Sequence, residues 1–203
     1  MNINFRNIYI IYPLLYFSLL IGFYFNEDFG LGYITDYSVH KTYISLFEKD
    51  FTKTLLNFDK FTTSHSPIYY IFVLFLEKIS FNETFSRLVN LHLSLLIPYF
   101  FYLCLKIKYK FHNENLGVLI PCVIFVSPYF RSSSIWLGSE NLSLIFLLVS
   151  FYFFLKHEDT KEKNLSYILF NVFFLACAAY IRPIYSLFSI YFFLKFCLNL
   201  KLS

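Results

Sequence analysis

Long apolar runs alternate with short polar breaks along most of the 203-residue chain. A membrane-spanning helix needs about 20 apolar residues, and shorter segments cross where the bilayer is thin or distorted. We expect helices at Ile8–Phe25, Pro67–Ile79, Phe85–Ile107, Leu116–Phe130, Ser133–Leu155, Leu165–Ile181 and Pro183–Leu200. These runs are apolar all round, unlike amphipathic surface helices. The pattern therefore predicts an all-α, polytopic transmembrane helix bundle with six or seven spans.

The segment Asn26–Ser66 is the only long polar stretch, and it carries six acidic residues against four lysines. Apolar residues recur in it at roughly helical spacing, as Tyr43, Ile44 and Phe47 illustrate. We expect one or two amphipathic helices lying parallel to the membrane plane, with a solvated loop as the alternative. Residues 1–203 then form one transmembrane domain: the first span at 8–25, an outward-facing loop at 26–66 and the helical bundle at 67–200. Because the chain ends directly after an apolar helix, we expect it to be incomplete at the C-terminus.

Orientation depends on whether Pro67–Ile79 crosses the membrane. With a cytoplasmic N-terminus and seven crossings, the loops that carry Lys106, Lys108, Lys110 and Lys156, Lys161, Lys163 would both lie outside. Positive-inside counting requires those loops in the cytoplasm. Either Pro67–Ile79 is re-entrant or the whole chain is inverted, and we favour the re-entrant arrangement.

Composition narrows the class of protein further. Apolar residues make up 58% of the chain and charged residues 15%, against roughly 25% charged in ordinary soluble domains. A soluble enzyme of this size has too little interior to hide so much apolar surface. The net charge of +4 is scattered and forms no basic face, which excludes nucleic acid as a partner. We therefore expect a multi-pass integral membrane protein, in a bacterial inner membrane or an ER-like membrane, with the lipid bilayer as a partner.

The four cysteines lie inside apolar runs and have no Cys-x-x-Cys or Cys/His spacing, which indicates free, buried thiols. The sequence contains no metal-ligand motif. The cofactor is therefore unknown, and a requirement for a divalent metal is left open.

Acidic residues in and beside the apolar runs are candidates for chemistry, because a charge at membrane depth is costly and is usually retained for a role. Asp36 follows a glycine-rich turn in the polar segment and is suited to be a general base or a metal ligand. Glu27 and Asp28, next to the first span, are the fallback acids. Glu140 is a lone acid in an apolar stretch, where favourable interaction with a helix dipole is the structural alternative.

Two further features favour recognition of an anion. Ser64, His65 and Ser66 precede Pro67 at the start of a predicted helix, which suits a phosphate, although they also suit a simple N-cap. Arg87 and Arg182 lie at the edges of apolar helices. Snorkelling to the interface explains such placement, and binding of a lipid phosphate by the guanidinium is the alternative.

Together these motifs resemble the GT-C superfamily of integral-membrane glycosyltransferases, which take sugars from polyprenyl-phosphate donors. The resemblance covers most of residues 8–183: a first span, a loop with the acid of Gly-Tyr-Ile-Thr-Asp36, the helix start Ser66-Pro-Ile-Tyr-Tyr70, Ser86-Arg-Leu88, and Ser127-Pro128 followed by Glu140. The chain departs from the family at Ser66, where a second proline is usual.

The resemblance implies a function and roles for the site residues. The protein would move a sugar from a polyprenyl-phosphate donor to a lipid-linked, glycan or protein acceptor at the outer face of the membrane. Asp36 would act as the catalytic base and Glu140 as a second catalytic acid, while His65, Arg87 and Arg182 would bind the donor phosphate. A transporter or flippase-like bundle and a non-catalytic membrane subunit are the competing hypotheses. No inverted repeat supports the first of these, and the short chain favours the second.

Overall fold

The computed structural model describes residues 8–28, 33, 37–61, 63, 66–80, 82–110, 114–160 and 164–201. Every regular element among them is helical, which confirms the all-α class. The elements are α1 (Ile8–Tyr24), α2 (Ser38–Lys49), α3 (Phe51–Leu56), η3 (Phe58–Lys60), α4 (Pro67–Ser80), α5 (Glu83–Ser94), α6 (Leu96–Tyr109), α7 (Glu114–Cys122), η4 (Val123–Val126), α8 (Pro128–Ile135), α9 (Ser139–Asp159), α10 (Leu165–Ile181), η5 (Pro183–Ser186) and α11 (Leu187–Lys201).

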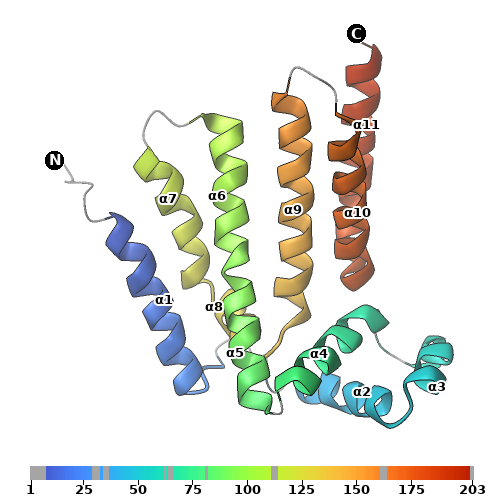
Figure 1. Cartoon of the computed structure of the whole chain (residues 1–203). Coiled ribbons are helices and arrows are strands. Elements are labelled where there is room, and N and C mark those ends of the chain that lie inside the picture. The colour runs from blue at the N-terminus through green and yellow to red at the C-terminus, as the bar shows by residue number, and fades with distance from the viewer. Residues whose placement is uncertain are drawn as a thin grey trace.

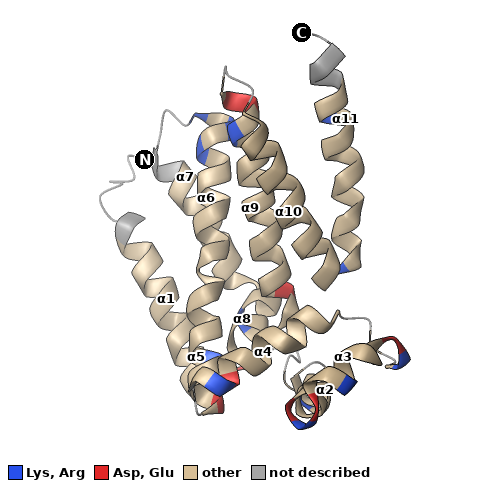
Figure 2. Cartoon of the chain, turned by 45° about the vertical axis from the view of Figure 1, so that its right-hand side comes forward, with Lys and Arg blue, Asp and Glu red and all other residues tan. Residues whose placement is uncertain are grey.

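Figure 1 shows that α1, α7, α6, α9, α10 and α11 run alongside one another, whereas α2, α3 and α4 lie across one end of this bundle. We call that end the capped end. The opposite end carries Lys106, Lys108 and Lys110 at the end of α6, with Lys156 and Lys195 on α9 and α11, and we call it the lysine end (Figure 2). The predicted helix Pro67–Ile79 is α4, and it packs against α2 and α5 at the capped end.

The expectation of six or seven spans is not supported. Among the described residues, α9 and the continuous stretch Glu83–Tyr109 are long and apolar enough to cross a membrane. A third span results if the bent pair Gly117–Val126 and Pro128–Ile135 counts as one. The other apolar helices are too short: α1 and α10 have 17 residues each, about 25 Å of helix, against a hydrocarbon core of about 30 Å.

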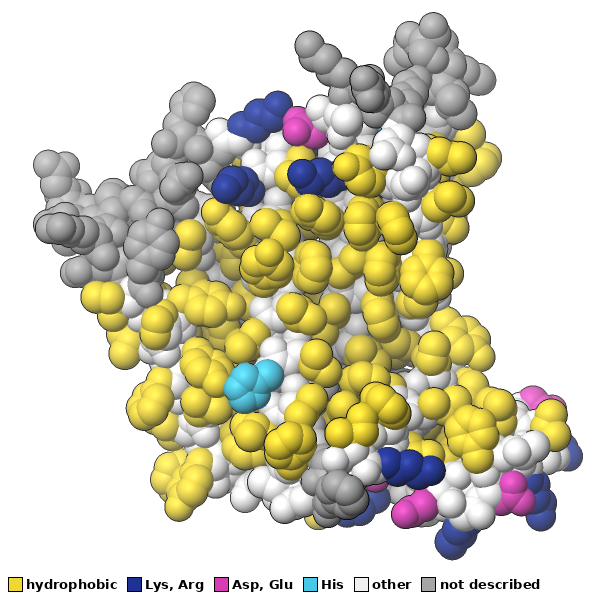
Figure 3. All heavy atoms as spheres, in the orientation of Figure 1, with side chains coloured by type: hydrophobic (Ala, Val, Ile, Leu, Met, Phe, Trp, Pro, Cys, Tyr) yellow, Lys and Arg dark blue, Asp and Glu magenta, His cyan; other side chains and the backbone are white. Residues whose placement is uncertain are grey.

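The exposed side chains are nonetheless those of a membrane protein. Figure 3 shows a broad band of apolar side chains across one face of the bundle, and Figure 2 shows the charged residues gathered toward its two ends. Large apolar side chains on α1, α10 and α11 are exposed in this band, including Phe17, Phe173 and Phe193. A patch of this extent favours contact with a lipid bilayer.

The two predicted helices Leu116–Phe130 and Ser133–Leu155 do not exist as continuous elements. The first is bent by 71° between η4 and α8, at Ser127, whose extended backbone precedes Pro128. Proline fixes its own φ and disfavours the helical conformation for the residue before it, which explains the break. The second begins only at Ser139, because Leu137 adopts a left-handed conformation with φ of 56°.

The polar segment contains α2 and α3, as the amphipathic pattern predicts. α2 buries His40, Ile44 and Phe47, and the Asp50 side chain caps α3 by accepting a hydrogen bond from the Lys53 amide at 2.9 Å. Aromatic rings fasten these helices to α4, for example Phe47 and Tyr70 with ring centroids 6.3 Å apart. The described part of the segment is therefore an ordered cap.

Buried asparagines hold the long helices together. Asn171 of α10 donates to the Ser150 carbonyl and hydroxyl of α9, at 3.0 and 2.8 Å. Asn141 of α9 donates to Ser94 Oγ of α5 and to the Phe130 carbonyl of α8, at 3.1 and 3.2 Å. Such hydrogen bonds hold helices together where apolar burial gives little driving force between them.

We expect Asn141→Leu to reduce the free energy of unfolding by about 2 kcal/mol, because it removes hydrogen bonds to two other helices and leaves buried acceptors unsatisfied. Equilibrium unfolding in mixed micelles measures this loss. Asn57→Leu is the matched control, because it removes solvent-exposed hydrogen bonds to Lys53 and Lys60. Equal stabilities of the two variants would contradict a structural role for Asn141.

Candidate functional site

A polar turn lies at the centre of the capped end. It consists of α8 and the residues Trp136, Leu137 and Gly138 that link α8 to α9. The hydroxyl of Tyr69 on α4 donates to the Leu137 carbonyl. Ser133 packs directly against Gly138, where a Cβ would clash because it would lie 2.0 Å from Ser133 Oγ. We call α8 together with residues 136–138 the α8 turn.

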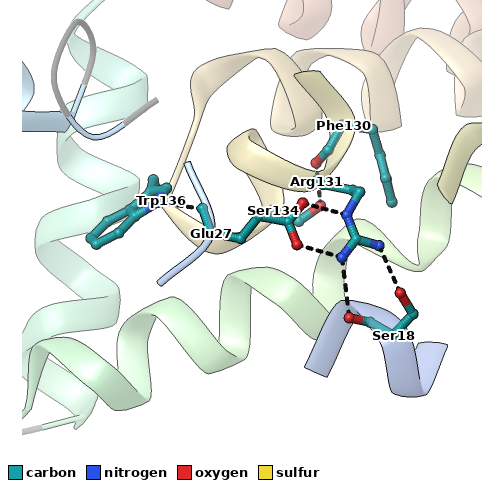
Figure 4. Close-up of polar contacts among 6 residues, drawn as sticks. All are labelled: Ser18, Glu27, Phe130, Arg131, Ser134 and Trp136. Atoms are coloured by element: carbon teal, nitrogen blue, oxygen red, sulfur yellow. Dashed lines mark hydrogen bonds and ion pairs between the residues drawn. The ribbon is translucent and has the colours of Figure 1, made fainter. Parts of the chain in front are cut away.

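The fallback acid Glu27 is joined to Arg131 of the α8 turn. Arg131 donates from Nε and Nη2 to the two carboxylate oxygens of Glu27, each at 2.5 Å, and also to the Ser18 carbonyl and hydroxyl of α1 (Figure 4). The side chains are only 14% and 10% exposed. Such a bidentate, largely buried pair joins α1 to α8, and it leaves Glu27 unsuited to act as a base.

Residues of α1 and of the α8 turn pack closely around the Glu27–Arg131 pair. Gly22 on α1 faces Glu27, and a Cβ there would lie 2.2 Å from Glu27 Oε2. Trp136 Nε1 donates to the Glu27 carbonyl at 2.9 Å. The other fallback acid, Asp28, accepts from Ser132 Oγ at 2.9 Å and from the Tyr33 amide at 3.2 Å. Both fallback acids therefore position the loop after α1.

Arg87 on α5 is also held within the protein. Its guanidinium lies 3.7 Å from the Trp136 ring centroid, and it donates to the Ile135 carbonyl and to Asn26 Oδ1, both at 2.9 Å. The residue is only 7% exposed. In this conformation Arg87 supports the α8 turn through stacking and hydrogen bonds, and it presents little surface to a phosphate.

Glu140 and Arg182 form an ion pair, although 42 positions separate them in the sequence. Glu140 lies in the first turn of α9, and Arg182 follows the last residue of α10. Arg182 Nε also donates to Ser139 Oγ at 3.1 Å. The side chains are 39% and 29% exposed, so this pair is open to solvent and to a ligand. The fold thus brings together two of the predicted site residues.

The other two, Asp36 and His65, lie outside the described residues. Their sequence neighbours belong to the capped end. Tyr37 is buried at the start of α2, and Thr63 Oγ1 lies 2.8 Å from the Tyr70 hydroxyl of α4. Burial raises the pKa of Tyr70, and the positive charge of Arg182 opposes that rise, which places Arg182 within electrostatic reach of α4.

A charged cluster that the sequence reading missed lies between α2, α4 and α5. Lys41 Nζ is 2.5 Å from Glu83 Oε2, and Glu77 on α4 is close enough to affect both. Burial raises the pKa of Glu77, and the neighbouring Glu83 adds to the rise while Lys41 opposes it. The feature of the sequence that could have revealed this cluster is Glu77, an acidic residue inside the short apolar run Pro67–Ile79.

No family model matches this chain, and comparisons with curated proteins and with solved structures give no match. The resemblance to GT-C glycosyltransferases therefore rests on the short motifs alone. Within the described part of the chain, no group of three or more His, Cys, Asp or Glu side chains is arranged to hold a metal ion.

The Glu27–Arg131 pair gives a stability prediction. Arg131→Gln leaves the Glu27 carboxylate largely buried without its partner, and we expect it to reduce the free energy of unfolding by about 3 kcal/mol. The double variant Glu27→Gln with Arg131→Gln buries no unpaired charge, so it should recover part of that loss. Unfolding in mixed micelles measures both. The single variant Glu27→Gln completes the cycle, and a double variant whose loss equals the sum of the two single losses would rule out the coupling.

Glu77 gives a pH prediction. Its carboxyl has a higher pKa in the folded protein than the usual 4.5, so the folded state holds the proton more tightly than the unfolded state does. Wild-type stability should therefore fall, relative to Glu77→Gln, as the pH rises from 4.5 through the raised value. We expect the variant to melt at a higher temperature at pH 7 and the difference to shrink below pH 4.5. Asp59→Asn, at an exposed position of η3, is the control, and a pH-independent difference would contradict the assignment.

Proposed function

We propose that this protein is a membrane glycosyltransferase that moves a sugar from a polyprenyl-phosphate donor to an acceptor hydroxyl at the capped end. The observation that carries the proposal is the solvent-accessible Glu140–Arg182 pair. An arginine and a carboxylate side by side supply a cation for a departing phosphate and an acceptor for a proton. These are the groups that sugar transfer from a lipid phosphate needs.

The reaction assigns a role to each group. The acceptor oxygen forms a bond to the anomeric carbon of the sugar, while the bond between that carbon and the phosphate oxygen breaks and its electron pair leaves with the polyprenyl phosphate. Asp36 takes the acceptor proton as the base, with Glu140 as a second carboxylate. Arg182 neutralises the charge that develops on the phosphate, together with His65.

The surroundings of the pair support a lipid-borne donor. The capped end adjoins the exposed apolar band, so a polyprenyl tail can stay among lipids while its phosphate reaches Arg182 (Figure 3). The buried Ser133 of the α8 turn supports the carboxylate of the pair, since its hydroxyl donates to Glu140 Oε2 at 3.4 Å.

A non-catalytic membrane subunit is the second candidate function. The observation that favours it is that Arg87 and Glu27, two of the predicted site residues, are bonded within the protein. The two functions differ in whether the Glu140–Arg182 pair has a chemical role, which a transfer assay tests directly.

Membranes that contain the protein should transfer labelled sugar from polyprenyl-phosphate-linked donors. We expect Arg182→Gln and Glu140→Gln each to lower the turnover number about 100-fold, the loss typical of removing one group that stabilises transition-state charge. Asp36→Asn should have an effect at least as large. Arg182→Lys, which keeps the charge, should retain more activity than Arg182→Gln. Lys49→Gln, on the exposed surface of α2, is the matched control.

Folding of every variant is checked by its melting temperature in detergent. Folded variants that all transfer sugar as well as the wild type would remove the pair and Asp36 from the mechanism. A folded wild-type protein that transfers no sugar from any polyprenyl-phosphate donor would favour the non-catalytic subunit.

A further inference from the structure

A groove at the lysine end, far from the α8 turn, is lined by side chains of α6, α9 and α11. Its volume is about 400 Å³, and its lining includes Cys104, Phe151, Phe154 and Tyr191 below and Lys108 and Lys195 toward the end of the bundle. A second hollow of about 360 Å³ lies beside it and shares Lys110 and Asp159 with it.

The floor of the groove is aromatic because α9 and α11 meet through rings. Phe154 packs against Phe192 and Tyr191, with ring centroids 4.8 and 5.8 Å apart, and Phe151 packs against Phe192 at 5.0 Å. Large rings keep the two backbones apart, which leaves apolar space toward the lysine end. An acyl chain fits the chemistry of that space.

Positive charge surrounds the mouth of the groove. The groove itself is lined by Lys108, Lys110 and Lys195 against Glu158 and Asp159, a net charge of +1, and the neighbouring hollow adds Lys106 and Lys156. Lys110 pairs with Asp159 at 2.9 Å, at the part of the lining that the two hollows share. Lys108 and Lys195 are exposed, and neither forms an ion pair with another described residue. The charge that remains is therefore suited to an anion.

We propose that this groove binds one acidic phospholipid, with an acyl chain against Phe151 and Phe154 and the headgroup phosphate at Lys108 and Lys195. Charge complementarity and the apolar floor together favour this occupant. A zwitterionic lipid can place an acyl chain on the aromatic floor, but it brings no net negative charge to the lysines. A free anion can pair with the lysines, but it leaves the aromatic floor without an apolar partner. The site is independent of the proposed sugar transfer, which takes place at the opposite end of the bundle.

The proposal is tested by native mass spectrometry of the full-length protein in detergent. The probes are dioleoyl phosphatidylglycerol, dioleoyl phosphatidylcholine and inorganic phosphate. We expect one retained phosphatidylglycerol per protein, weaker retention of phosphatidylcholine, and no displacement of the lipid by millimolar phosphate. The double variant Lys108→Ala with Lys195→Ala should weaken phosphatidylglycerol binding roughly 30-fold, since each lysine near a lipid surface adds about a factor of five.

Two controls separate the groove from general attraction of charge. Lys49→Ala with Lys53→Ala removes the same charge from α2 and α3 at the capped end and should leave binding unchanged. Lys108→Arg with Lys195→Arg keeps the charge and should keep the lipid. Equal retention of the two lipids, displacement by phosphate, equal loss in both alanine double variants, or a second protein copy in place of the lipid would each overturn the proposal.

Discussion

The structure depends on hydrogen bonds to the backbone carbonyls at a place where the helices break inside an apolar bundle. At the α8 turn the chain leaves helical geometry twice, at Ser127 and at Leu137, where water is scarce and an unpaired carbonyl is costly. Side chains from other helices supply the missing partners. Asn90 donates to the carbonyls of Ser133 and Ser134, and Arg87 donates to that of Ile135. The polar residues of α5 are thus required by the shape of α8.

This constraint also positions the candidate site. The same turn that needs Asn90 and Arg87 fixes where α9 begins, and hence where Glu140 lies. Arg182 reaches Glu140 because α10 packs along α9 and ends at the same level, with Arg182 bonded to Ser139. A solvent-accessible ion pair therefore rests on a buried turn whose carbonyls accept hydrogen bonds from α4 and α5. The turn thereby holds the ion pair in a defined geometry.

Much of the fold was predictable from the sequence, and the exceptions have physical causes. Apolar runs located α1, α4 and α10 well, because burial and lipid contact both select apolar residues. The break at Leu137 was missed, because no neighbouring residue in the sequence indicates that this leucine adopts a left-handed conformation. The contact of Tyr69 with its carbonyl and the close packing of Ser133 against Gly138 explain it in the structure. The pairing of Glu27 with Arg131 spans 104 positions, and a single sequence carries no signal for such a contact.

The two ends of the bundle differ in how their charges are arranged. At the capped end the described arginines are held by hydrogen bonds or by carboxylates, as Arg131 and Arg182 illustrate. At the lysine end the cations outnumber the acids. Positive-inside counting weighs Lys and Arg and not net charge, and the capped end carries Lys41, Lys49, Lys53, Lys60 and Lys78 beside its arginines. Among the described residues the cations are no fewer at the capped end than at the lysine end, so the two ends differ in how their charges are paired and not in how many cations they carry.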